Sequence, residues 1–202
     1  MEAFAATLVR AVEASDVAAV RLRMPYANDD EIRRAAARLK PVVQKREIAF
    51  LLDAHANIAA EIEADGVHLE ADDIPYARAR ALVGPDAIVG VNCYGSRHIA
   101  MEAAEAGADY VGFGPFFASE AEIDLLSWWS ELMTVPCVAE GDITPANCAP
   151  LVQAGADFLA VADAVWSHSD GPAAAIAEFN QAIADALERR QARDSRSVVS
   201  SN

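Results

Sequence analysis

A small residue followed by aspartate and an apolar run occurs four times along this chain. The aspartates lie at intervals of 49, 44 and 48 residues, and each follows a stretch with helical periodicity. One further apolar run stands between consecutive aspartates, so each period holds two units of a short strand and a helix. Alternating strands and helices of this length favour a parallel sheet, and four double units make a (β/α)8 barrel. The four aspartates are Asp16, Asp65, Asp109 and Asp157.

Seven apolar runs of strand length can be assigned in the chain, whereas a barrel of this type has eight strands. In the later periods a strand starts about 20 residues before the aspartate, and for Asp16 that position falls before Met1. We therefore expect an α/β fold, a TIM (β/α)8-type barrel whose first strand is missing from the chain. An open barrel exposes two strand edges. Either the protein starts upstream, or a partner or the first helix covers the gap. The predicted strands are 17–23, 47–52, 66–69, 87–92, 110–113, 135–139 and 158–161.

The length of 202 residues and the 53% of hydrophobic residues are sufficient for one barrel domain, which we predict for residues 1–190. The last helix is predicted to run from about Gly171 to Arg190, and the polar residues 191–202 to form a disordered tail. Near the start, Asn28 is predicted to cap a helix whose first turn is acidic.

The chain is strongly acidic, with 31 Asp and Glu against 16 Lys and Arg and a formal net charge of −15. This balance disfavours nucleic acid and anionic membranes as partners, because both require a basic surface. The three cysteines form no CxxC pair, and the chain has neither a leader pattern nor a long apolar run. We predict a cytoplasmic location and a small-molecule phosphate ligand, and we leave open whether the protein forms a homo-oligomer.

Lysine is scarce, which removes two classes of chemistry. Lys40 and Lys45 are the only lysines, and both belong to one polar-faced helix or its end. A Schiff-base enzyme needs a lysine inside a pocket, and a Walker loop needs a Gly-Lys pair, which is absent.

Barrel sites lie at the carboxyl ends of the strands, on the loops that follow. In this chain those ends bring two arginines together with a larger number of carboxylates. The polar residues predicted at this mouth are Arg21, Arg23, Asp53, His68, Glu70, Asp72, Asp73, Asn92, Cys93, Glu140, Asp142 and Asp163.

Three segments of the chain resemble thiamine phosphate synthases, and a looser resemblance extends over residues 4–178. It implies the barrel fold and a transferase of thiamine biosynthesis. The family joins an aminopyrimidine diphosphate to a thiazole phosphate and releases pyrophosphate. The segments are Asp65-Gly66-Val67-His68-Leu69 with Asp72-Asp73-Ile74-Pro75, Gly84-Pro85-Asp86-Ala87-Ile88-Val89-Gly90-Val91, and Ala106-Gly107-Ala108-Asp109-Tyr110-Val111-Gly112-Phe113-Gly114-Pro115-Phe116-Phe117.

The resemblance implies a substrate-binding and catalytic role for Arg23, which matches an arginine that binds the pyrimidine and the diphosphate. On the same strand Arg21 replaces a glutamine and Pro25 replaces a lysine. His68 is matched in the family, and its role is either proton chemistry or that of a hydrogen-bonded core residue. Asn92 takes the place of a hydroxyl residue and is expected to donate to the leaving diphosphate.

Magnesium is the cofactor that the resemblance implies. Asp73 matches one of the family's magnesium carboxylates. Asp53 stands beside the position of the other and is expected to substitute for it with shifted geometry. For Asp72 and Asp73 the alternative is a solvated helix start.

The phosphate cup of the family is altered in this chain. Gly141-Asp142 and Ala162-Asp163 stand where backbone amides of the family hold the thiazole phosphate. These four residues and Gly114 are the expected substrate-binding positions, but Asp142 and Asp163 replace small residues there. A carboxylate about 4 Å from a phosphate costs roughly 4 kcal/mol at an effective dielectric near 20. The lysine-bearing loop that follows Phe117 in the family is also absent.

Three functions therefore remain open at this stage. The first is a thiamine phosphate synthase with a changed site. The second is a catalytically silent family member, a pseudoenzyme that binds a ligand or regulates a partner. The third is a thiazole tautomerase-like isomerase in which His68 or a carboxylate moves the proton.

Overall fold

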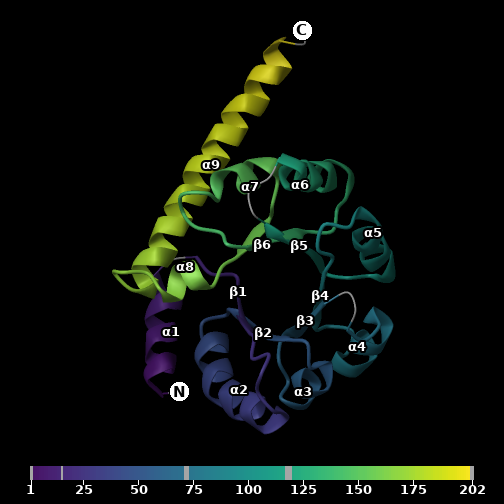
Figure 1. The fold of residues 1–202 in the computed structure, drawn as a ribbon, viewed down its shortest axis with the longest axis vertical. Coiled ribbons are helices and arrows are strands. Elements are labelled where there is room, and N and C mark those ends of the chain that lie inside the picture. The colour runs from purple at the N-terminus through teal and green to yellow at the C-terminus, as the bar shows by residue number, and fades with distance from the viewer. Residues whose placement is uncertain (1, 15, 71–72, 117–119, 201–202) are drawn as a thin grey trace.

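The computed structural model describes residues 2–14, 16–70, 73–116 and 120–200. Within them, one sheet of seven parallel strands curls around a central axis, and each strand pairs only with its neighbours in sequence (Figure 1). Phe113 and Phe116 flank a register shift on the fifth strand. The strands are β1 (Ala19–Leu22), β2 (Ala49–Asp53), β3 (Gly66–Glu70), β4 (Ile88–Asn92), β5 (Tyr110–Phe116), β6 (Cys137–Gly141) and β7 (Phe158–Ala160).

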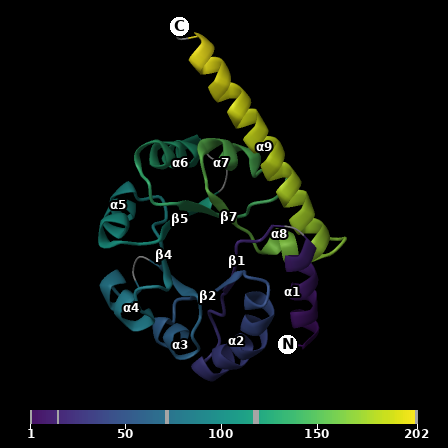
Figure 2. The same ribbon diagram turned by 180° about the vertical axis from the view of Figure 1, so that it is seen from behind.

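Helices surround this sheet on its outer side (Figures 1 and 2). No helix among the described residues is long and apolar enough to span a membrane. The helices are α1 (Glu2–Ala14), α2 (Asp29–Gln44), α3 (Ala56–Glu61), α4 (Tyr76–Val83), α5 (Arg97–Ala106), α6 (Glu120–Leu132), α7 (Ala149–Ala154), α8 (Asp163–Trp166) and α9 (Pro172–Ser200).

The barrel architecture and all seven predicted strands are confirmed, with boundaries that differ by up to three residues. The capping prediction is also confirmed. The Asn28 side chain accepts a hydrogen bond from the Glu31 backbone N–H, and the Glu31 carboxylate accepts one from the Asn28 backbone N–H. The last helix is longer than predicted, since α9 continues to Ser200 rather than ending near Arg190. Arg193 lies beyond that predicted end, and it donates to the Gln153 carbonyl of α7 at 3.4 Å.

The sheet is open between β1 and β7, which are its two edge strands in the described chain. α1, α8 and α9 gather on this side of the molecule (Figure 2). The rings of Phe4 on α1 and Trp166 on α8 pack with their centres 4.9 Å apart. Asn180 on α9 donates to the Asp16 carbonyl at 3.1 Å. Helices therefore flank the side of the barrel where the sheet does not close.

The repeated aspartates share one structural role. The backbone N–H of Asp65 donates to the Phe50 carbonyl at 3.0 Å, and the Asp65 carboxylate accepts a hydrogen bond from the backbone N–H of Phe50 at 2.7 Å. Asp109 makes the same pair of bonds with Val89, at 3.0 and 2.7 Å. Asp157 makes it with Cys137, at 3.1 and 2.8 Å. Each aspartate thus fixes the start of the next strand against the start of the preceding strand. Asp16 precedes the edge strand β1 and has no earlier strand in the described chain.

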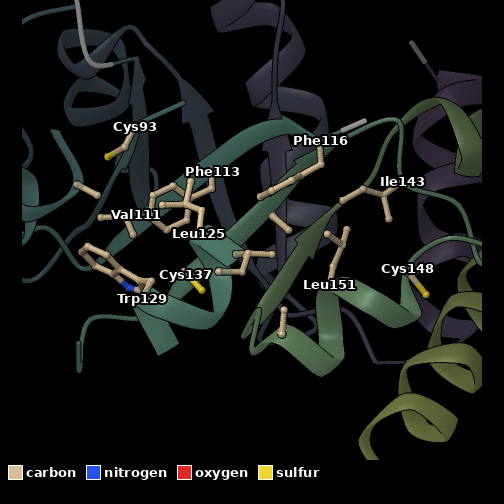
Figure 3. Close-up of a cluster of buried hydrophobic side chains, with 14 of the residues drawn as sticks. Cys93, Val111, Phe113, Phe116, Leu125, Trp129, Cys137, Ile143, Cys148 and Leu151 are labelled. Atoms are coloured by element: carbon tan, nitrogen blue, oxygen red, sulfur yellow. The ribbon is translucent and has the colours of Figure 1, made fainter. Parts of the chain in front are cut away.

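The apolar core between sheet and helices consists of two clusters. One packs the outer faces of β1 to β4 against α1 to α4, around Phe50 and Ile58. The other packs β4 to β7 against α5, α6, α7 and α9, around Phe113 and Trp129 (Figure 3). All three cysteines are free and belong to the second cluster. Burial raises the pKa of the Cys93 and Cys137 thiols to about 12, so both are poor nucleophiles.

We predict that Asp157→Ala lowers the free energy of unfolding by about 1–3 kcal/mol, because the Cys137 amide loses its acceptor. Asp86→Ala removes the same charge from an exposed position and serves as the control. Urea denaturation followed by circular dichroism measures both. Equal stability of the two variants would contradict the structural role given to the repeated aspartates.

Candidate active site

The inner face of the barrel is polar. Along β3, Val67 and Leu69 belong to the outer core, so His68 and Glu70 point to the inside because side chains alternate along a strand. Inward positions of (β/α)8 barrels are usually filled by branched apolar residues. Here charged and hydroxyl groups take several of these positions, and they come from different strands.

Arg21 on β1 is the centre of this inner layer. Its two terminal nitrogens donate to the two carboxylate oxygens of Glu140 on β6, at 2.9 and 2.8 Å. Its Nε lies 3.4 Å from Asp53 on β2. Burial alone would lower the pKa of Arg21, but the hydrogen bonds and charge of Glu140, together with Asp53, raise it above its ordinary value. The guanidinium thus links β1 to a strand next to the opposite edge of the sheet.

Arg23 stands at the rim of the same mouth. Its side chain is 63% exposed, and its Nε lies 3.2 Å from the second carboxylate oxygen of Asp53. The Arg23 terminal nitrogens have no partner among the described residues. Burial raises the pKa of Asp53, while Arg21 and Arg23 act in the opposite direction. The structure therefore provides one engaged arginine and one available arginine.

His68 is the most deeply buried polar side chain of the layer, with 1% of it exposed. Its Nδ1 lies 2.8 Å from the hydroxyl of Tyr110, and its Nε2 lies 3.4 Å from Glu140 without forming a hydrogen bond. Burial and the charges of Arg21 and Arg23 lower the pKa of His68 to about 3. The ring is therefore neutral at physiological pH.

Two glycines make room for this layer. A Cβ atom on Gly90 would lie 1.9 Å from the ring of Tyr110, which pairs with Gly90 across β4 and β5. A Cβ atom on Gly112 would lie 2.8 Å from the Glu140 carboxylate and 3.3 Å from the His68 ring. Glycine at these positions is required by close packing against side chains.

Asn92 is committed to protein partners. Its amide nitrogen donates to Glu70 at 2.9 Å, and its amide oxygen accepts from the Tyr94 backbone at 3.1 Å. Asn92 is 7% exposed. Cys93, the next residue, is buried in the outer core. A ligand would have to displace Glu70 before the Asn92 amide could donate to it.

The residues predicted to form a phosphate cup follow β5, β6 and β7. Gly114 and Gly141 each allow close contact between β5 and β6. A Cβ atom on Gly114 would lie 2.3 Å from the Glu140 carbonyl, and one on Gly141 would lie 2.5 Å from the Phe116 amide. Asp142 and Asp163 are exposed. Ala162 is the N-cap of the short helix α8.

The two carboxylates predicted to bind magnesium follow neighbouring strands. One oxygen of Asp53 is buried and lacks a hydrogen bond. Asp73 accepts the Glu70 amide at 2.9 Å, and Asp72 lies outside the described residues. No cluster of three metal-ligating side chains occurs among the described residues. Asp53 and Asp73 would supply two carboxylate ligands, and a magnesium ion held by them would keep water and phosphate oxygens as its other ligands.

Tyr110 is a residue of the inner layer that the sequence analysis missed, and the partnership of Arg21 with Glu140 is a pairing that it missed. A signal for Tyr110 was present in Gly90, since a glycine inside a strand marks a close approach by another group. No comparable sequence pattern predicted the ion pair between Arg21 and Glu140, which lie 119 residues apart in the sequence.

We predict a pH dependence of stability from His68. The pKa of His68 is lowered from 6.5 to about 3, so the unfolded chain binds this proton more readily than the folded chain. The contribution of His68 to the free energy of unfolding is therefore fully present above pH 6.5. It is lost as the pH falls toward 3, by up to about 1.4 kcal/mol per pH unit. In His68→Gln this dependence is absent, so chemical denaturation between pH 4.5 and 8 gives a difference curve that slopes only below about 6.5.

The exposed His98→Gln is the control for that measurement. Its difference curve against the unsubstituted protein is expected to be flat. A flat difference curve for His68→Gln would show that His68 is protonated equally in both states.

Comparison with known proteins agrees with this geometry. The sequence model of a family described as thiamine monophosphate synthase matches residues 1–165. A thiamine-phosphate synthase of Rhodospirillum centenum is 52% identical over 189 residues, which cover 90% of this chain and 91% of the relative. One of Hyphomonas neptunium is 45% identical, with 89% and 86% covered. The solved thiamine phosphate pyrophosphorylase of Pyrococcus furiosus superposes with a TM-score of 0.79 at 28% identity, with 89% of each chain covered. The chain belongs to the thiamine monophosphate synthase family.

Proposed function

We propose that this protein catalyses the reaction of its family, in which an aminopyrimidine diphosphate and a thiazole phosphate give thiamine phosphate and pyrophosphate. The observation that carries this proposal is the exposed Arg23 at the carboxyl end of β1, with its terminal nitrogens directed to no described partner. Two relatives that are named thiamine-phosphate synthase and match along most of their length support the same reaction.

The chemical demand of this reaction is leaving-group stabilisation. The bond between the pyrimidine substrate and its diphosphate breaks, and the bonding electron pair leaves on the pyrophosphate. A guanidinium is suited to that charge because it donates two parallel hydrogen bonds to phosphate oxygens. We assign this donation to Arg23, and the exposure of its side chain and the 3.2 Å contact of its Nε with Asp53 support the assignment.

Magnesium, when bound, would supply further positive charge to the diphosphate oxygens. Asp53 and Asp73 are the residues proposed to hold it. The buried Asp53 oxygen that lacks a hydrogen bond supports this assignment, and a metal ion there would compete with the Arg21 Nε, which lies 3.4 Å from the same oxygen.

Ligand binding without turnover is the second candidate. It is favoured by the position of Arg21, whose guanidinium is occupied by Glu140 and Asp53 and is not available to a leaving group. The tautomerase-like alternative has less support, since a general acid–base works best with a pKa near the working pH and the pKa of His68 lies near 3.

We predict that purified protein given both substrates and magnesium releases pyrophosphate and forms thiamine phosphate. Arg23→Gln is expected to lower kcat/KM by about 10- to 100-fold, because charge on the leaving group loses its donor. Arg34→Gln, which removes a guanidinium from the exposed face of α2, is expected to retain full activity. A coupled pyrophosphate assay measures all three proteins. Turnover no faster than the enzyme-free background would remove the synthase proposal and leave the binding candidate.

A second prediction concerns the phosphate cup. Asp142→Gly with Asp163→Ser removes two exposed carboxylates from the loops after β6 and β7. Thiazole phosphate is expected to bind several-fold more tightly, since its negative charge then meets less repulsion. Isothermal titration gives the affinity, and Asp86→Asn together with Asp170→Asn controls for net charge. Equal effects of the two double substitutions would show that the cup residues act only through net charge.

A further inference from the structure

The two arginines of the mouth differ in what remains available to a ligand. The terminal nitrogens of Arg21 are bound to Glu140 at 2.9 and 2.8 Å, and its Nε faces Asp53. Arg23 has only its Nε engaged. A phosphate and a carboxylate present the same pair of acceptor oxygens to a guanidinium. An anion that approaches Arg21 must therefore compete with Glu140 for the same donors.

The position of Glu140 is built into the barrel. The Glu140 side chain is 13% exposed, and its Oε1 lies only 2.8 Å from the position that a Cβ atom of residue 112 would take. The His68 ring lies against it at 3.4 Å. The Arg21 side chain is itself 23% exposed, so it is not fully sealed from solvent. The ion pair thus lies at the floor of the mouth, where an anion held by Arg23 would be close to it.

We propose that Glu140 acts as an internal competitor that withholds Arg21 from anionic ligands, so that Arg23 alone meets the diphosphate. This inference rests on the proposed function, because it concerns the same mouth and the same class of ligand. It assigns Glu140 a positioning role exerted through Arg21. Its consequence is that the mouth binds diphosphate more weakly than two arginines would allow.

A purely structural role of the ion pair would give a different result. In that case Glu140 would only join β1 to β6, and its removal would change stability without changing anion affinity. The test therefore measures anion affinity and thermal stability separately.

The probe is inorganic pyrophosphate, titrated calorimetrically into the full chain at low ionic strength. Glu140→Gln is close in shape and leaves Asp53 beside Arg21. It is expected to bind pyrophosphate about 5- to 20-fold more tightly than the unsubstituted protein. Glu105→Gln removes the same charge from an exposed position on α5, outside the mouth, and it is expected to change affinity by less than twofold.

The decisive comparison repeats Glu140→Gln in an Arg21→Gln background. If Glu140 acts by withholding Arg21, the gain in affinity disappears there. A gain of the same size in both backgrounds would overturn the inference, because it would then arise from charge removal alone. A second variant, Gly112→Ala, keeps every charge and displaces Glu140 by the added Cβ. It is expected to shift affinity in the same direction and provides the test if Glu140→Gln does not fold.

Failure of the inference and failure of the proposed function give distinct results. If the unsubstituted protein binds pyrophosphate and Glu140→Gln binds it no more tightly, the inference is wrong and the proposed function stands. If none of the folded variants binds pyrophosphate, including those with Arg21 released, both are wrong.

Discussion

The barrel depends on a repeated pair of hydrogen bonds between an aspartate and the backbone of the preceding strand, which is called the aspartate clamp below. An aspartate in the turn after a helix bonds to the backbone amide and carbonyl of a single residue at the start of the preceding strand, and this occurs at Asp65, Asp109 and Asp157. Such a clamp tolerates little variation, because both bonds must form with the same residue. The helix between the two strands must therefore return the chain to the same end of the sheet. The near-constant spacing of the aspartates in the sequence reflects this geometric requirement.

The outward packing of the strands determines which side chains lie inside the barrel. Once alternate residues of each strand pack outward against helices, the others converge on a narrow axis. In this chain the converging residues include Arg21, Asp53, His68, Tyr110 and Glu140. Charges in such a place require partners, since an unpaired buried charge is costly. The pairing of Arg21 with Glu140 meets that requirement and, in doing so, commits a guanidinium that the mouth would otherwise offer to a ligand.

The sequence predicted the fold well because the fold is a repeat. Strand ranges, the Asn28 cap and the position of the mouth all depend on periodicity or on local capping chemistry. The last helix extends past the polar boundary at Arg190, and Arg193 donates to a carbonyl of α7 that lies far away in the sequence. Which mouth residues are available could not be predicted, since it depends on pairs distant in sequence. Arg21 and Arg23 look alike in the chain but differ in their partners and in their exposure.

The division of the outer core into two clusters has a mechanical consequence. The clusters meet at β4, and across the open side of the sheet the halves are joined by the contacts of α1 with α9 and by the ion pair at the axis. Local openings in proteins tend to involve contiguous packing units rather than single residues. Each half of this barrel is packed as such a unit. Arg23, which follows β1, and the proposed phosphate cup after β6 and β7 are carried by different halves, so any movement of one half against the other would change the distance between them.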